Sequence, residues 1–257
     1  MPATASRAAL ALLGLAAVAS AEPAPPGRDV GTRRLAGRAV EVTAAYQWSM
    51  AAGTLGAPWS LAIDAAWAVT PELTLGVSHS AQAQGRVRGG GGLCIESDAH
   101  LCDALYAGGY LDARLALPGS PGVTLLARLG ADLVGPDPAK PVMRVGAGLR
   151  RRWGQAWLVA QPELAIALAE RGNGNEDGVL VPVWAGVDLS PVRVWLETGL
   201  DSDIEAFADE VRLRFGVGAA RDLGPVTLGL SLGFPQLFGP QNSGRLRQAA
   251  LSLTWFR

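Results

Sequence analysis

The sequence predicts an all-β protein, a single closed antiparallel transmembrane β-barrel. First, stretches that alternate apolar and polar residues recur from Arg38 to the end of the chain, as in 40–48 and 250–256. A period of two places one set of side chains on each face of a strand. Second, one face is apolar and nearly free of charge, while the other carries acids and arginines. Third, 49% of the residues are hydrophobic and 18% are charged. Yet no apolar run beyond residue 21 reaches the ~18 residues of a spanning helix.

The first 21 residues predict a cleaved secretory signal peptide. Arg7 and the terminal amine form a positive start, residues 8–18 are apolar, and residues 19–21 form a small-x-small cleavage site. The alternative is a helix buried in the mature fold. Residues 22–37 are polar and rich in Pro and Gly, so we expect a flexible periplasmic lead-in before a barrel over 38–257. Removal of Arg7 leaves 21 basic residues (22 − 1) and 23 acidic residues, a net charge of −2. Because there is no basic run, nucleic acid is not an expected partner.

The alternating stretches predict twelve strands, most of them long enough to cross a membrane at a tilt, which takes ~9–11 residues. Short turns follow every second strand and longer loops lie between, as in membrane barrels, so both chain ends fall on the short-turn side. Pro162, Pro182 and Pro235 interrupt predicted strands, and a closed barrel has no free edge to accommodate proline. Either these prolines mark bulges in the predicted strands, or the barrel has ten or fourteen strands instead of twelve. The predicted strands are 38–50, 57–69, 72–83, 104–117, 122–134, 141–152, 155–168, 179–189, 191–203, 209–221, 224–235 and 245–256.

The outward positions of the clearest strands carry no charge. Strand 57–69 presents Trp59, Leu61, Ile63, Ala65, Trp67 and Val69, and strand 224–235 presents Val226, Leu228, Leu230, Leu232 and Phe234. A charge on a lipid-facing position costs ~2–4 kcal/mol at the membrane midplane, so its absence is expected of a surface that contacts lipid. Four tryptophans fall near strand ends, where aromatic girdles meet the membrane–water interface. They are Trp48, Trp59, Trp67 and Trp255.

The inward positions hold acids and arginines, and hairpin register places several opposite charges side by side. Such cross-strand pairs stabilise a sheet by a few tenths to ~1 kcal/mol each. Two interpretations are open. In the first, these ion pairs fill and rigidify the lumen. In the second, the charges that remain unpaired line a path for a solute. Inward glycines, among them Gly186 and Gly218, leave room for water or serve barrel curvature. The predicted pairs are Asp112 with Arg128, Asp188 with Arg193, Asp132 with Arg144, and Asp201 with Arg212. Further inward charges are Glu41, Asp64, Arg114, Arg150, Glu163, Glu197, Asp203, Glu210 and Arg214.

On these features the chain resembles the bacterial outer-membrane β-barrel proteins. The resemblance covers the signal segment, the hairpin pattern over 38–257 and the C-terminal strand. Members of that family end in an alternating strand with a final aromatic residue, which the barrel assembly machinery recognises. The matching residues are Leu251, Leu253, Trp255 and Phe256, and Arg257 departs from the pattern. The resemblance implies export to the bacterial outer membrane, with outer-membrane lipid and the assembly machinery as partners.

We expect a narrow passive channel for small polar solutes, with no cofactor and no enzymatic activity. Twelve strands do not decide this, because eight are filled by side chains and sixteen leave a channel. The alternative is a structural or adhesive barrel, in which ion pairs close the lumen and the surface loops carry out the function. A lipid-modifying outer-membrane enzyme is the third hypothesis, because residues 78–82 are superficially similar to the His-x-Ser-Asn run of lipid hydrolases. Ala81 stands where that run has its serine, and no Asn follows.

Cys94 and Cys102 predict a disulfide, because an exported chain meets an oxidising periplasm. The bridge would stabilise its small loop by roughly 2–3 kcal/mol in the chain-entropy model. Zinc bound by Cys94, His100 and Cys102 is the alternative. Two polar loops, 173–177 and 201–209, offer oxygen ligands of the kind that calcium takes but lack the glycine spacing of a calcium loop. We therefore expect solvated surface loops and no metal site.

Overall fold

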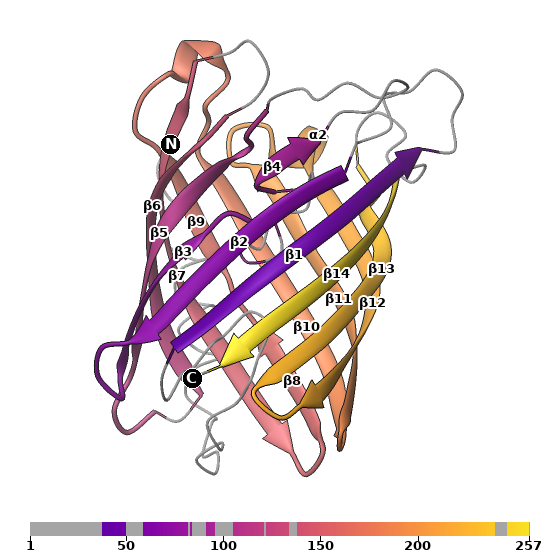
Figure 1. Cartoon of the computed structure of the whole chain (residues 1–257). Helices are drawn as coiled ribbons and strands as arrows, with labels where there is room; N and C mark the ends of the chain where they lie inside the picture. The colour runs from indigo at the N-terminus through magenta and orange to yellow at the C-terminus, as the bar shows by residue number, and fades with distance from the viewer. Residues whose placement is uncertain are drawn as a thin grey trace.

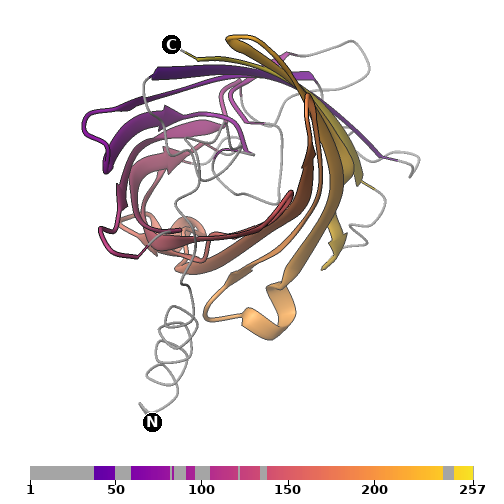
Figure 2. The same ribbon diagram turned by 90° about the horizontal axis from the view of Figure 1, so that it is seen from below.

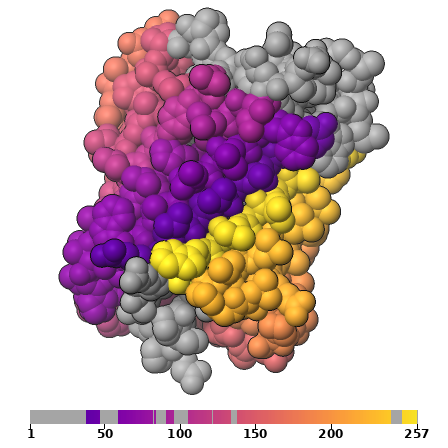
Figure 3. Space-filling model, viewed as in Figure 1, coloured from indigo at the N-terminus to yellow at the C-terminus, as the bar shows by residue number. Residues whose placement is uncertain are grey.

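The computed structural model describes residues 38–49, 59–81, 83, 91–95, 105–120, 122–133, 138–239 and 246–256. Its strands form one antiparallel sheet that closes on itself, because β1 (Arg38–Ser49) pairs with both β2 (Trp59–Ala68) and β14 (Leu246–Phe256). The predicted closed barrel of twelve strands is confirmed. Figure 1 shows β1 and β14 side by side, Figure 2 shows the ring of strands from below, and Figure 3 shows their side chains meeting along a diagonal seam.

The other strands follow in chain order around the wall, and most pair with their neighbours in the sequence. The exceptions are β3, which pairs with β2 and β5, β4, which pairs with β2, and β8 and β9, which both pair with β7 and β10. Short turns gather at one end of the barrel, which we call the turn end, and longer connections gather at the other, the loop end. Ala39 pairs with Phe256 at the turn end, so the barrel begins and finishes there. The remaining strands are β3 (Leu73–Ser78), β4 (Leu93–Ile95), β5 (Gly108–Ala116), β6 (Val123–Asp132), β7 (Lys140–Trp153), β8 (Ala156–Ala160), β9 (Glu163–Ala167), β10 (Gly178–Leu189), β11 (Val192–Asp203), β12 (Arg212–Leu223) and β13 (Val226–Phe238).

The prolines interrupt hydrogen bonding without changing the strand count. At Pro162 one predicted strand divides into β8 and β9, and both halves pair with β7 and β10 in the same register. Pro182 stays within β10 opposite Gly199 of β11. Pro235 lies where the register between β12 and β13 shifts, which is the bulge expected of a proline in a closed sheet.

The predicted strand 72–83 is wrong at its second half. The strand ends at Ser78, and the described residues that follow, 79–81 and 83, leave the wall and turn into the lumen. The short strand β4 takes the vacated place, since it pairs with β2 and Leu93 bridges to Tyr106 just before β5. The hydrogen bonds of the inward turn, described below, outweigh the alternation that continues through residues 79–83.

The outer face of the barrel is an apolar band, as the alternation predicts. Leu61, Ile63, Leu228 and Leu230 are exposed on it, whereas most outward residues of β1 and β10 are half-buried. Trp59, Trp67 and Trp255 also lie outward near strand ends, and Trp48 lies near the end of β1. Trp153 is a further outward tryptophan near the turn end, with the Arg151 guanidinium 5.2 Å from its ring centre. Within the described residues, no helix has the length and apolar character needed to cross a membrane.

The carboxylate of Asp177 is one of the anchors of the loop-end connection 168–177, together with the Asn175 side chain. Asp177 accepts a hydrogen bond from the backbone N–H of Ala167 at 2.9 Å, and its Oδ1 lies 2.7 Å from Nη2 of Arg171. The bond from Ala167 is the larger cause, and Arg171 the second, of a pKa for Asp177 below its ordinary value of 3.8. This stabilisation is present at pH values above the ordinary carboxyl pKa, and it is lost as the pH falls through the lower pKa of the folded loop.

An NMR titration in detergent micelles tests this assignment. We expect the Asp177 carboxyl group to titrate below 3.8 in the wild type. Arg171→Ala should raise that pKa only part of the way back, because the Ala167 N–H remains in place. A wild-type value at or above 3.8 would contradict the loop geometry.

Candidate functional site in the barrel lumen

One inner wall of the barrel, from β2 to β9, is held by a buried ionic network centred on Arg128 of β6. Its Nε lies 2.9 Å from Oδ1 of Asp112 on β5, and its Nη1 lies 3.2 Å from Oε1 of Glu163 on β9. Nη2 donates a hydrogen bond of 2.9 Å to the carbonyl of Ala83. The Arg128 side chain is 1% exposed, so its charge depends on these partners. The structure therefore brings the predicted residues Asp112 and Arg128 together and adds Glu163 to them.

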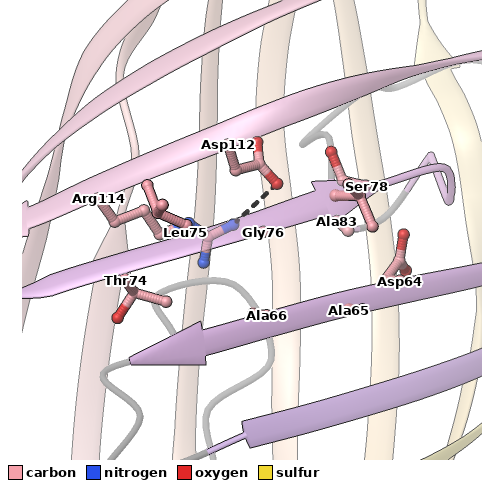
Figure 4. A pocket seen from close by; sticks show the side chains of 11 residues that line it. Asp64, Ala65, Ala66, Thr74, Leu75, Gly76, Ser78, Ala83, Asp112 and Arg114 are labelled. Atoms are coloured by element: carbon pink, nitrogen blue, oxygen red, sulfur yellow. Dashed lines mark ion pairs between the residues drawn. The ribbon is translucent and has the colours of Figure 1, made fainter. Parts of the chain in front are cut away.

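The inward segment, residues 79–81 and 83, is anchored to this wall at Asp64 of β2. Oδ1 of Asp64 accepts hydrogen bonds from the backbone N–H groups of His79 at 2.6 Å and Ser80 at 3.0 Å. The hydroxyl of Ser80 donates to the other carboxylate oxygen. Together with the bond from Arg128 to Ala83, these contacts hold the segment against the inner face. Figure 4 shows the small cavity that results, lined by Asp64, Thr74, Ser78, Ala83, Asp112 and Arg114.

Replacing Asp64 with alanine should release the inward segment. Three donors lose one charged acceptor, and hydrogen bonds to charged groups each contribute about 1.5–3 kcal/mol. We expect the amide hydrogens of His79 and Ser80 to exchange with solvent at least tenfold faster, measured by hydrogen exchange on the refolded protein. Asp64→Asn keeps one acceptor oxygen and should give an intermediate rate. Unchanged exchange in Asp64→Ala would show that the segment is held by other contacts.

A second cluster on the same wall surrounds Tyr110 of β5. Its hydroxyl donates to Asp132 at 2.7 Å and accepts from Arg144 at 3.0 Å, and the Arg144 guanidinium lies 4.5 Å from its ring centre. Arg144 and Asp132 are 3.8 Å apart. They are not directly opposite, because the register of β6 and β7 sets Asp132 opposite Lys140. The predicted register is therefore wrong by four residues, since Arg144 is opposite Arg128, and Tyr110 bridges the offset between Asp132 and Arg144.

Near the turn end, Asp188 of β10 collects three partners. The Nε of Arg193 and the Nη1 of Arg152 each lie 2.9 Å from its carboxylate, and the indole N–H of Trp157 donates to it at 3.1 Å. The predicted pair of Asp188 and Arg193 is therefore present, with two contributors that the hairpin register does not reveal.

The predicted residues on β11 and β12 are arranged differently. Register sets Asp201 opposite Arg212, but the guanidinium of Arg212 pairs with Glu210. Arg214 lies 5.2 Å from the ring centre of Trp184, and the charges of Glu197 and Asp201 act on it.

Three tryptophans that the sequence analysis left unassigned also face inward. Trp157, Trp184 and Trp195 form one buried cluster with Val159 and Ala220. The expectation that inward glycines leave room for water is wrong at Gly186 and Gly218. A Cβ at Gly186 would lie 2.5 Å from the Trp157 ring, and one at Gly218 would lie 2.1 Å from the Trp195 ring. The indoles occupy the space that these two glycines leave.

The side chains of His79 and Ser80 hydrogen-bond different partners and not each other. The Ser80 hydroxyl donates to Asp64, whereas Nδ1 of His79 hydrogen-bonds the Tyr106 hydroxyl. Burial raises the pKa of Tyr106 above its ordinary value, and repulsion from the charge of Asp64 adds to the shift. Tyr106 therefore stays protonated at neutral pH, and its hydroxyl engages Nδ1 of His79. A histidine must accept the serine proton in a nucleophilic dyad, so this geometry does not supply one.

The proposed zinc ligands and disulfide lie partly outside the described residues. Cys94 is in β4 opposite Ser60, whereas His100 and Cys102 are not described. Residues 1–37, with the predicted signal peptide and lead-in, and Arg257 are outside the description as well. Over the described ranges, no three His, Cys, Asp or Glu residues are grouped to hold a metal ion.

Comparison with known proteins places the fold. No family model and no curated protein matches the sequence. Among solved structures, the KdgM porin in complex with disordered oligogalacturonate has a TM-score of 0.55 at 6% identity, over 85% of this chain and 99% of that one. OmpT with loop L8 deleted, an outer membrane protein of Vibrio cholerae, gives 0.37 at 11% identity, over 85% and 97%. The outer membrane channel DcaP of Acinetobacter baumannii gives 0.33 at 14% identity, over 82% and 70%. The fold of this chain is that of the bacterial outer-membrane β-barrel proteins.

Proposed function

We propose that this protein is a narrow passive channel of the bacterial outer membrane for small polar solutes. The observation that carries the proposal is a set of buried polar atoms on the inner face that have no partner in the described structure. Thr43 Oγ1, Trp184 Nε1, Glu197 Oε2 and Gln236 Nε2 belong to this set, and they come from four different strands. A dry core rarely leaves such atoms unpaired, whereas a lumen that admits water and polar solutes satisfies them.

The inward segment and the fold comparison support this proposal. The inward segment lies in the lumen beside Asp64 and Arg128, which is consistent with a narrow route for small solutes. The KdgM porin shares the barrel fold and was solved with an oligogalacturonate. By analogy, a barrel of this shape can pass polar molecules without a cofactor or a catalytic group.

We further propose an orientation with the turn end in the periplasm. Outer-membrane barrels have short periplasmic turns and long outer loops. Both ends of the barrel lie at the turn end, so a signal peptide over 1–21 and a lead-in over 22–37 would precede it on the periplasmic side. The assembly machinery would bind the last strand through the following residues. They are Leu251, Leu253, Trp255 and Phe256 in β14.

A closed structural or adhesive barrel is the second candidate. It is favoured by the burial of Arg128 and Glu163, which are each 2% exposed, and by the tryptophan cluster of β8, β10 and β11. In that case the lumen would contribute rigidity, and the connections at the loop end would carry the function.

Liposome swelling distinguishes the two candidates. Protein refolded into liposomes should give swelling with arabinose, a small neutral sugar, and much slower swelling with the larger sugar raffinose. Heat-modifiable migration on gels establishes that the barrel is folded in the same preparation. Folded protein that gives no swelling with arabinose would overturn the channel proposal and favour the closed barrel.

A further inference from the structure

We infer that Trp184 and Trp195 form a selectivity zone in this lumen, and that the zone favours hydroxyl-bearing solutes such as small sugars and polyols. The inference rests on the proposed channel function and adds to it the place of selection and the class of solute. It depends on the packing of the two indoles, on their unpartnered N–H groups and on the carboxylate of Glu197, which lies on β11 opposite Trp184.

The tryptophans and glycines alternate along one row across neighbouring strands. Register places Gly186 of β10 opposite both Trp157 of β8 and Trp195 of β11, and Trp195 is also opposite Gly218 of β12. Each ring lies over a neighbouring glycine, where a Cβ would collide with it. The row therefore presents indoles side by side along the wall. Trp184 lies two residues away from Gly186 on β10 and belongs to the same buried cluster.

The N–H groups of these indoles differ in a way that points to a ligand. Trp157 donates to Asp188, so its hydrogen bond is satisfied within the protein. The N–H groups of Trp184 and Trp195 have no acceptor in the described structure, although the side chains are only 2% and 6% exposed. A buried indole N–H normally finds a partner, since it can only donate.

An unpartnered acceptor lies in the same zone. Glu197 of β11 is directly opposite Trp184, and its Oε2 has no hydrogen-bond donor. Arg214 lies over the Trp184 ring, and the nearby charges of Glu197 and Asp201 balance it, so the zone is not a simple anion site. A hydroxyl group both donates and accepts, and adjacent hydroxyls can satisfy both an indole N–H and a carboxylate. This combination favours sugars and polyols over inorganic ions and over apolar solutes.

The test separates the N–H groups from the bulk of the rings. Trp184→Phe with Trp195→Phe keeps an aromatic ring at each position and removes both donors. We expect arabinose-driven swelling to slow by about 3- to 10-fold, the effect of losing one or two hydrogen bonds. Conductance in KCl should stay within about twofold of the wild type, because ions do not require these donors. The matched control is Trp153→Phe, since Trp153 is 52% exposed on the outer face, and it should change neither quantity.

The possible results separate this inference from the channel proposal. If the double variant swells in arabinose at the wild-type rate, the selectivity zone is refuted and the channel proposal still stands. Equal loss of arabinose uptake and KCl conductance would also overturn the selectivity zone, because that result indicates a collapsed lumen. If the double variant does not fold, the single variants Trp184→Phe and Trp195→Phe give the same comparison. Wild-type protein that passes neither arabinose nor KCl would refute the channel proposal itself.

Discussion

Replacing Arg128 with methionine is expected to lower the free energy of unfolding by about 3–5 kcal/mol, because Asp112 and Glu163 would remain buried with an uncompensated negative charge. Both carboxylates lie within 3.2 Å of the guanidinium, and the side chains of all three residues are at most 6% exposed. Urea unfolding of the protein refolded in lipid vesicles, followed by tryptophan fluorescence, measures the change.

Two further variants make the Arg128 result specific. Arg221→Met removes an exposed arginine of β12 and should change the unfolding free energy by less than about 0.5 kcal/mol. Adding Asp112→Asn and Glu163→Gln to Arg128→Met should recover part of the lost stability, because the uncompensated charges are then absent. If Arg128→Met were as mild as Arg221→Met, the lumen around Arg128 would be well hydrated and the network weak.

Placing an arginine at Leu230 is expected to destabilise the barrel by ~2–4 kcal/mol, the cost of a cation on the lipid face near the midplane. Leu230 lies near the middle of β13 and is 49% exposed on the outer face. Ser231→Arg places the same charge at the same depth on the inner face. We expect it to cost less than about 1 kcal/mol in the same unfolding assay. A larger effect at Ser231 than at Leu230 would mean that the two faces are assigned the wrong way round.

The features that follow from local alternation and short turns could be predicted from the sequence. The period of two separates the faces, and the even number of strands lets the antiparallel sheet close into a barrel. Asp188 and Arg193 are predictable partners because only a short turn separates them. Asp112 and Arg128 are joined in the same way, by the turn between β5 and β6.

Contacts between distant parts of the chain could not be predicted in this way. Arg128 meets Glu163 across β7, and the inward segment leaves the wall because Asp64 and Arg128 bind its backbone at residues 79, 80 and 83. Neither contact has a signature in hairpin register. Alternation within residues 72–83 continues past Ser78, so the sequence pattern alone favours a longer strand than the one that forms.

The inward tryptophans could have been found from parity alone. Trp184 shares its parity with Asp188 on β10, and Trp195 shares its parity with Arg193 on β11, so both belong to the polar face. The preference of tryptophan for membrane interfaces suggests outward positions, but the glycines of neighbouring strands provide space for it inside. Alternation is therefore the stronger guide to the direction of a side chain in this barrel.

The central claim is that a polar route passes through the barrel. Planar-bilayer recording of the refolded wild-type protein in KCl tests it most directly. The account predicts discrete conductance steps above the bare-membrane background, and predicts that Asp64→Ala makes them larger or noisier by releasing the inward segment from the wall. Folded, heat-modifiable protein that inserts into the bilayer and gives no steps, in the wild type or in Asp64→Ala, would contradict the claim and identify a closed barrel.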